Sequence, residues 1–178
     1  MLLHDMGKPA LKTMDEAGVA HFKKHAAESE KIAKRILKRL KFDNDTLNKV
    51  TKLVFYHDYR MPGSFQNVRR AMNKIGEELF PYYMQIRKAD TLAQSEYRRQ
   101  EKLKNLEEIE DIYQEICRQK QCVSLKTLEV KGGDLIQAGV EKGPQIGVIL
   151  NRLLELVIED PEMNKKELLL KEAEKIIR

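Results

Sequence analysis

A histidine and an aspartate stand side by side near the start of the chain, as His4 and Asp5. Neighbouring side chains on a helical segment point about 100° apart. The pair can therefore hold one cation from two directions, or the carboxylate can bridge two cations. Later in the chain, three more residues offer the same kinds of ligand: His25, His57 and Asp90. Imidazoles and carboxylates together suit Mn, Fe, Ni, Zn or Mg rather than metals that prefer thiolates.

A divalent cation held by such residues lowers the pKa of a water molecule and neutralises a phosphate oxygen. The set therefore predicts metal-dependent hydrolysis of a phosphate ester, with Asp5 as the catalytic residue. Taken singly, the other members have simpler interpretations. His57 can be a core histidine with its hydrogen bonds satisfied, and Asp90 can pair with Arg87.

Helices are predicted to position these residues, because small and apolar side chains recur at steps of three and four along most of the chain. The first predicted helix spans residues 21–40 and places His21 and His25 on one face, a spacing that suits metal binding. The second carries His57 on its inner face, and its start is capped by Asp43 or Asn44. Later helices are predicted from residue 64 or 65 to about 76, and along the stripes 79–97, which includes Asp90, and 103–116.

The sequence changes in character after residue 122. Residues 125–130 are predicted to form one short strand, and Gly132 and Gly133 open a short helix. Pro144 then favours a helix start, because its missing N–H would have no partner there. A last helix is predicted from a capping box, in which Asn164 is followed three residues later by Glu167. A soft boundary therefore falls near residues 122–126.

Positive charge is concentrated in the first part of this basic chain, whose net charge is +5. Between residues 21 and 41, eight Lys or Arg side chains stand against two Glu. Clustered cations attract polyanions, and nucleic acid is the obvious one. A solvated helix face gives the same pattern. The candidate RNA-binding residues are Lys23, Lys24, Arg35, Arg39, Arg69 and Arg70.

Length and composition exclude several classes of protein. The 178 residues suffice for one domain with or without a small appendage. The sequence has no run of 18 apolar residues and no basic-then-apolar leader, so we expect no membrane partner. Cys117 and Cys122 show neither metal spacing nor a disulfide framework, which favours a cytoplasmic location.

The ligand set resembles the HD superfamily of metal-dependent phosphohydrolases. The family pattern runs His, then His-Asp, then a distant Asp, with extra histidines between them in dinuclear members. His4 and Asp5 match the doublet, and Asp90 matches the closing aspartate. His25 and His57 match the intermediate pair. The resemblance implies that these five residues are metal ligands.

Longer blocks resemble the HD-containing portion of bacterial tRNA nucleotidyltransferases, the CCA-adding enzyme and poly(A) polymerase family. The blocks run in the family's order from about residue 2 to 170 and include LLHDMGKP, LVFYHDYR, VRRAMNKIG and LFPYYMQIRKADTLAQS. The block KGGDLIQAGVEKGPQIGVILNRLLELVIEDPEMNKKELL is similar to the segment that contacts tRNA in that family. The resemblance implies an HD-like metal-binding domain over residues 1–122 and a tRNA-contacting tail over 123–178.

Two parts of the family pattern are missing from the sequence. One is the nucleotidyltransferase head with its Gly-rich segment and acidic pair, and the other is the helix that carries the opening histidine. The resemblance therefore implies that this chain does not add CCA alone and that a separate head is a candidate partner. We expect weak binding of one metal, through Asp5, His25 and His57 or through His4, Asp5 and Asp90, and mobile residues 1–10.

The predicted fold is all-α, an HD-like helical bundle truncated at its N-terminus, with a small helical C-terminal extension. The predicted function is binding of tRNA or other RNA, combined with metal-dependent phosphohydrolase activity. Two alternatives stay open: a tRNA-binding module without catalysis, and an inactive helical remnant.

Overall fold

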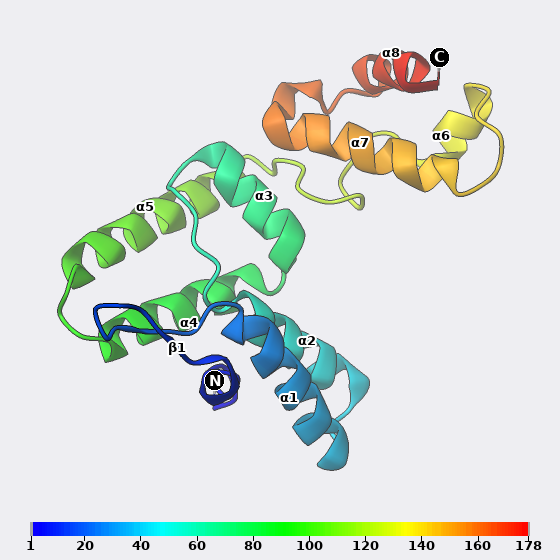
Figure 1. Cartoon of the computed structure of the whole chain (residues 1–178). Helices are drawn as coiled ribbons and strands as arrows, with labels where there is room; N and C mark the ends of the chain where they lie inside the picture. Colours follow the sequence, from blue (N-terminus) through cyan, green and yellow to red (C-terminus); the bar gives the residue numbers. More distant parts are fainter. Residues whose placement is uncertain (1, 178) are drawn as a thin grey trace. The chain divides into compact units, whose positions relative to one another are not determined.

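The computed structural model describes residues 2–177, and over that range the fold is all-α, as predicted (Figure 1). The sheet in this range is one antiparallel pair, β1 (Thr13–Met14) and β2 (Ala20–His21). No helix within these residues is long and apolar enough to span a bilayer. The helices are α1 (His25–Arg39), α2 (Asn44–Tyr56), α3 (Phe65–Ile75), α4 (Phe80–Ala93), α5 (Arg99–Arg118), α6 (Gly132–Gln137), α7 (Gln145–Glu159) and α8 (Lys166–Ile177), with short 3-10 turns at Pro9–Leu11 and Pro161–Met163.

The chain divides into two compact units, each built from two separate segments. The first unit contains Met1–Met61 and Ile75–Glu107, and the second contains Pro62–Lys74 and Glu108–Arg178. The boundary expected near residues 122–126 therefore falls inside the second unit.

In the first unit, α1 packs along α2 (Figure 1). Ala33 and Leu37 line the inner face of α1, and Leu47 and Val54 line that of α2, all buried. Burying a side chain such as Leu contributes about 2 kcal/mol to folding. Asp43 caps α2, because its carboxylate accepts a hydrogen bond from the Thr46 N–H at 2.8 Å.

The structure corrects the predicted start of the first helix. Ala20 and His21 belong to β2, where His21 pairs with Thr13 on β1. Lys24 then has a left-handed backbone with φ 66°, so a right-handed helix can begin only after it. The helix accordingly starts at His25, and His21 and His25 do not share a helix face.

The predicted stripe over residues 79–97 is also too long. The helix α4 ends at Ala93, because the backbone of Gln94 is extended, with φ −77° and ψ 171°. Asp90 remains inside the last turn of α4, as predicted, whereas Tyr97 lies outside it and is exposed.

The second unit has its own apolar core. Leu135, Leu153 and Leu169 are fully buried at its centre, one from each of α6, α7 and α8. The α3 segment joins this unit through Arg69, which is 4% exposed. Its guanidinium donates to the carbonyls of Ile158 at 2.7 Å and Glu159 at 3.0 Å, at the end of α7. These bonds connect α3 to the end of α7 within the second unit.

Two local predictions in the tail are wrong. Residues 125–127 form a turn and residues 128–130 are irregular, so no strand forms there. The Asn164 side chain does not cap the last helix, which begins at Lys166. Its amide instead accepts from the Glu129 N–H at 3.0 Å and donates to the Thr127 carbonyl at 3.2 Å. The asparagine therefore ties down the segment that was expected to be a strand.

Candidate metal centre

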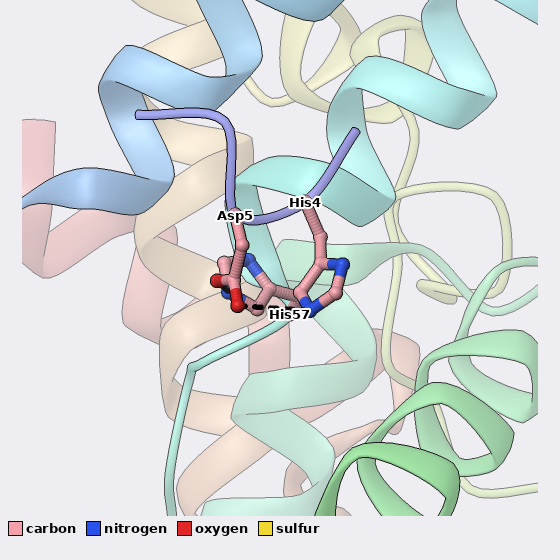
Figure 2. A group of neighbouring side chains, drawn as sticks. All are labelled: His4, Asp5 and His57. Atoms are coloured by element: carbon pink, nitrogen blue, oxygen red, sulfur yellow. Dashed lines mark ion pairs between the residues drawn. The ribbon is translucent and has the colours of Figure 1, made fainter. Parts of the chain in front are cut away.

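Three of the predicted ligands meet in the first unit. Figure 2 shows His4 and Asp5 on the N-terminal segment, with His57 beside them at the end of α2. One possible ligand atom from each of the three lies within 4.8 Å of the others. The closest approach to His4 is from Asp5, whose Oδ2 lies 3.3 Å from the His4 Nε2.

The other carboxylate oxygen of Asp5 faces a second group of ligand atoms. Its Oδ1 lies 3.4 Å from the Nε2 of His25 and 3.5 Å from the Nε2 of His57. This oxygen is buried and has no hydrogen-bond partner among the described residues. A buried carboxylate oxygen without a partner is costly, and a bound cation would remove that cost.

The two imidazoles are held so that their Nε2 atoms face each other at 3.0 Å. The Nδ1 of His25 lies 2.8 Å from the Phe22 carbonyl, and the Nδ1 of His57 lies 2.7 Å from the Val54 carbonyl. Because a carbonyl only accepts hydrogen bonds, each Nδ1 carries a proton, and a ring in its neutral form then presents a lone pair at Nε2. Burial lowers the pKa of His57, which favours this neutral, metal-binding form.

Cations already compete for the Asp5 carboxylate. The Lys8 ammonium lies 2.6 Å from Oδ2. Burial acts to raise the pKa of Asp5, but the hydrogen bond from Lys8 and the charges of His4, Lys8 and His57 outweigh it, so the pKa is lowered. The carboxylate is therefore ionised and can accept a metal on either oxygen.

Asp90 lies at the edge of this cluster. Its Oδ1 is 3.9 Å from the Nε2 of His4, and its Oδ2 accepts a hydrogen bond from Gln94 at 2.7 Å. The structure thus brings all five predicted ligands together, with Asp5 between a pair formed by His25 and His57 and a pair formed by His4 and Asp90.

A close backbone contact positions Asp5 against α1. The Gly7 N–H donates to the Ser29 hydroxyl at 2.9 Å, and Ser29 is fully buried. A Cβ on Gly7 would lie 2.5 Å from the His25 carbonyl oxygen, so a side chain does not fit there. Sequence reasoning did not identify Gly7 or Ser29. The glycine two residues after Asp5 was the available signal.

The ligands open into a cleft of about 330 Å³. Besides Asp5, His25, His57 and Asp90, its lining includes Lys8, His21, Phe22, Lys23, Asp58, Arg60 and Gln94. A second hollow of about 840 Å³ shares His4 and Asp90 with the metal cluster but is otherwise almost entirely apolar, with Leu37, Val54 and Ile86 among its walls. The candidate ligands therefore lie between a polar cleft and an apolar hollow.

The predicted RNA-binding residues occupy different environments. Lys23, Lys24, Arg35 and Arg39 are exposed in the first unit, and Lys23 lines the cleft. In the second unit Arg70 is exposed and pairs with Glu159. Arg69 is buried, and its guanidinium is engaged by carbonyls and by Gln121, which leaves it little surface for RNA.

The fold and the cluster define an all-α protein with a histidine–aspartate site that suits a divalent metal. Comparison with known families identifies the family of the chain, because the model of tRNA nucleotidyltransferase domain 2 matches residues 13–173. The chain belongs to this family. It is also 30% identical over 169 residues to the CC-adding tRNA nucleotidyltransferase of Thermus thermophilus.

That match covers 93% of this chain but only 37% of the relative. The chain thus spans little more than a third of the length of the curated relative that it matches. No solved structure matches the chain.

Proposed function

We propose that this protein is an HD-type, metal-dependent phosphohydrolase that acts on the phosphate esters of RNA. One observation carries the proposal: Asp5 Oδ1 and the Nε2 atoms of His25 and His57 face one another within 3.5 Å. The Asp5 oxygen carries negative charge, and each imidazole in its neutral form presents a lone pair at Nε2. Such an arrangement is unfavourable by itself and becomes favourable around a cation.

A divalent cation such as Mn, Ni, Fe, Zn or Mg, when bound, supplies an activated water and neutralises charge on a phosphate. The chain's own residues do the rest. His25, His57 and Asp5 would hold one metal, and His4, Asp5 and Asp90 would hold a second. Lys8 and Arg60 line the cleft beside them and would attract the phosphate oxygens of a substrate.

RNA is the substrate that the family relationship and the charge favour. The Thermus thermophilus relative is a CC-adding tRNA nucleotidyltransferase, so its printed activity concerns tRNA. Solvent-accessible cations at Lys23, Lys24, Arg35 and Arg39 lie in the same unit as the metal cluster. Because this chain spans 37% of that relative, nucleotide addition is not part of the function proposed for these residues.

A second candidate function is tRNA binding without catalysis. The position of Lys8 favours it, because the ammonium at 2.6 Å from Asp5 Oδ2 already neutralises the carboxylate. In that case the lysine takes the place of a metal and the cluster only stabilises the N-terminal segment. Binding would then rest on phosphate contacts and fall steeply with salt.

Metal binding separates the two candidates. Calorimetry with Mn²⁺ on untagged protein is expected to show saturable binding below millimolar concentration, lost in Asp5→Asn and retained in Asp45→Asn. Asp45 is a suitable control, because it is exposed and pairs with Lys49 on α2. Metal-loaded protein is then expected to hydrolyse an RNA ending in a 2′,3′-cyclic phosphate. Absence of saturable binding would reject the hydrolase and leave the tRNA-binding module, which a tRNA titration at several salt concentrations tests.

A further inference from the structure

Hydrolysis of a phosphate ester requires a proton for the leaving oxygen as well as a nucleophile. The inference drawn here rests on the proposed function and concerns the source of that proton. Four side chains that can carry positive charge line the cleft without being assigned as ligands: Lys8, His21, Lys23 and Arg60. Lys and Arg keep their protons near pH 7, whereas an imidazole exchanges its proton there. His21 is therefore the suitable donor by chemistry.

The structure holds His21 against a carboxylate. Its Nε2 lies 2.8 Å from Asp15 Oδ2. The other oxygen of Asp15 accepts from the Val19 N–H at 2.8 Å and the Ala17 N–H at 3.0 Å, so the turn between β1 and β2 fixes the carboxylate. The hydrogen bond from His21 also lowers the pKa of Asp15, which keeps the carboxylate ionised.

The backbone of His21 is tied to the metal cluster by a short stretch of chain. Within β2 it pairs with Thr13, and Thr13 Oγ1 donates to the His21 carbonyl at 3.4 Å. The next residue, Phe22, supplies the carbonyl that orients the His25 ring. The hairpin thus places an imidazole with its own carboxylate at the same cleft as the ligands, an arrangement in which a third group orients an acid or base.

We propose that His21, oriented by Asp15, is the general acid that protonates the leaving oxygen. Asp15 holds the Nε2–H, so Nδ1 is the nitrogen that gives its proton to the substrate. As a water oxygen forms a bond to phosphorus and loses a proton to solvent, the ester P–O bond breaks. The leaving oxygen takes that electron pair and the Nδ1 proton. The neutral imidazole then recovers a proton from solvent, so charge and atoms balance over one turnover.

The experiment compares two esters of similar shape, p-nitrophenyl phosphate and p-nitrobenzyl phosphate, with Mn²⁺-loaded protein. A p-nitrophenolate leaves without a proton, whereas a benzyl alkoxide needs one. General acid catalysis is worth about 10²–10⁴-fold, so His21→Gln is expected to slow the benzyl ester at least about 100-fold and the phenyl ester by no more than about threefold. Asp15→Asn is expected to show the same bias to a smaller degree. Asp45→Asn, which lies outside the cleft, is expected to change neither rate.

A structural role for His21 would give a different result. Equal losses on the two esters, or no loss on either, in a protein that is active before substitution would overturn the assignment while leaving the proposed function intact. Hydrolysis of neither ester by the metal-loaded wild-type protein would overturn the His21 assignment, and failure to hydrolyse the RNA with a 2′,3′-cyclic phosphate as well would overturn the proposed function. A second variant guards against a local folding defect: added imidazole is expected to restore the benzyl-ester activity of His21→Ala, and failure of that rescue in a protein that keeps its Mn²⁺ affinity would reject the proton-donor role.

Discussion

The Nε2 atoms of His25 and His57 lie 3.0 Å apart, and each ring has its Nδ1 against a backbone carbonyl. The two carbonyls belong to Phe22 and Val54, so the backbone itself sets the tautomer of both rings. In their neutral forms the two rings would face each other with lone pairs, which is unfavourable without a proton or a cation between them. A bound metal would stabilise this geometry, and the predictions about metal binding rest on it.

Removing one of these rings is expected to weaken metal binding strongly. Residues that only support a ligand typically affect metal affinity by about 10–100-fold, so the loss of a ligand itself in His57→Ala should cost at least about 100-fold in Mn²⁺ affinity. Isothermal titration of the metal-free protein measures this. His21→Gln is the control, because His21 lines the cleft but is not among the ligands. Equal affinities for His57→Ala and the wild type would contradict the ligand assignment.

The close contact at Gly7 predicts a loss of stability on adding a single methyl group. In Gly7→Ala the new Cβ would lie 2.5 Å from the His25 carbonyl oxygen and 2.7 Å from the Ser29 nitrogen. Both are backbone atoms of α1 and cannot move independently, so we expect a loss of about 1–3 kcal/mol in the free energy of unfolding.

Gly133→Ala provides the matched control for Gly7→Ala. Gly133 lies within α6, and a Cβ there would meet no atom within 4 Å. Alanine is favoured over glycine in a helix, so this variant should gain about 0.5–1 kcal/mol. Urea denaturation of the two variants tests the pair. A Gly7→Ala protein as stable as the wild type would mean that the loop is held away from α1.

Arg69 is expected to contribute to stability rather than to RNA binding. Arg69→Met would leave the carbonyls of Ile158 and Glu159 without the guanidinium that they now accept from. Unsatisfied buried carbonyls should lower the free energy of unfolding by about 3 kcal/mol. Arg70→Met removes only an exposed ion pair with Glu159 and should cost less than about 1 kcal/mol.

The same two variants distinguish the roles of the neighbouring arginines in RNA binding. Affinity for tRNA at fixed salt is expected to fall in Arg70→Met and to stay unchanged in the folded fraction of Arg69→Met. Thermal unfolding and a filter-binding titration on the same samples measure both properties. A loss of affinity in Arg69→Met without loss of stability would show that its charge reaches the RNA after all.

Because of Tyr83, the free energy of unfolding is expected to vary with pH in the alkaline range. Burial raises the pKa of Tyr83 to about 12, and its hydroxyl donates to the Tyr59 carbonyl at 2.6 Å. Because an unfolded tyrosine ionises near pH 10, the native state binds more protons between about pH 10 and 12, and stability falls as the pH rises through that window.

The Tyr83→Phe variant isolates this contribution. At about pH 8 it should be less stable than the wild type by about 1–2 kcal/mol, because the Tyr59 carbonyl loses its donor. The difference should shrink as the pH approaches about 12, where the wild type must release the phenolic proton. Urea midpoints at several pH values measure it, and a constant difference across the range would contradict a buried, un-ionised Tyr83.

The grouping of the candidate ligands could be predicted from the sequence, because imidazoles and carboxylates are conspicuous on apolar helix faces. His57 and Asp90 stood in line with apolar residues, and the structure places both beside His4 and Asp5. The all-α class could be predicted because apolar positions repeat at steps of three and four. Periodicity reports which face of a helix is buried, and a polar residue on that face attracts notice.

Several of the wrong predictions involve contacts outside the local helical pattern. The start of α1 depends on the pairing of His21 with Thr13, which competes with the helical pattern. Asn164 fits a capping box locally, yet its amide bonds to Thr127 and Glu129. Arg69 was predicted to bind RNA because no local feature of the sequence reveals that its guanidinium donates to the Ile158 carbonyl at the end of α7.

The discontinuous makeup of each unit has a practical consequence for dissecting the protein. Residues Pro62–Lys74 belong to the second unit although the first unit continues on both sides of them. A fragment cut at Glu107 would keep all five candidate ligands but would separate Pro62–Lys74, which includes the buried Val68, Ala71 and Met72, from the rest of the second unit. A shortened gene would thus yield a polypeptide with exposed apolar surface that is prone to aggregate. Replacing Pro62–Lys74 with a brief polar connector is the more promising route to a minimal metal-binding protein.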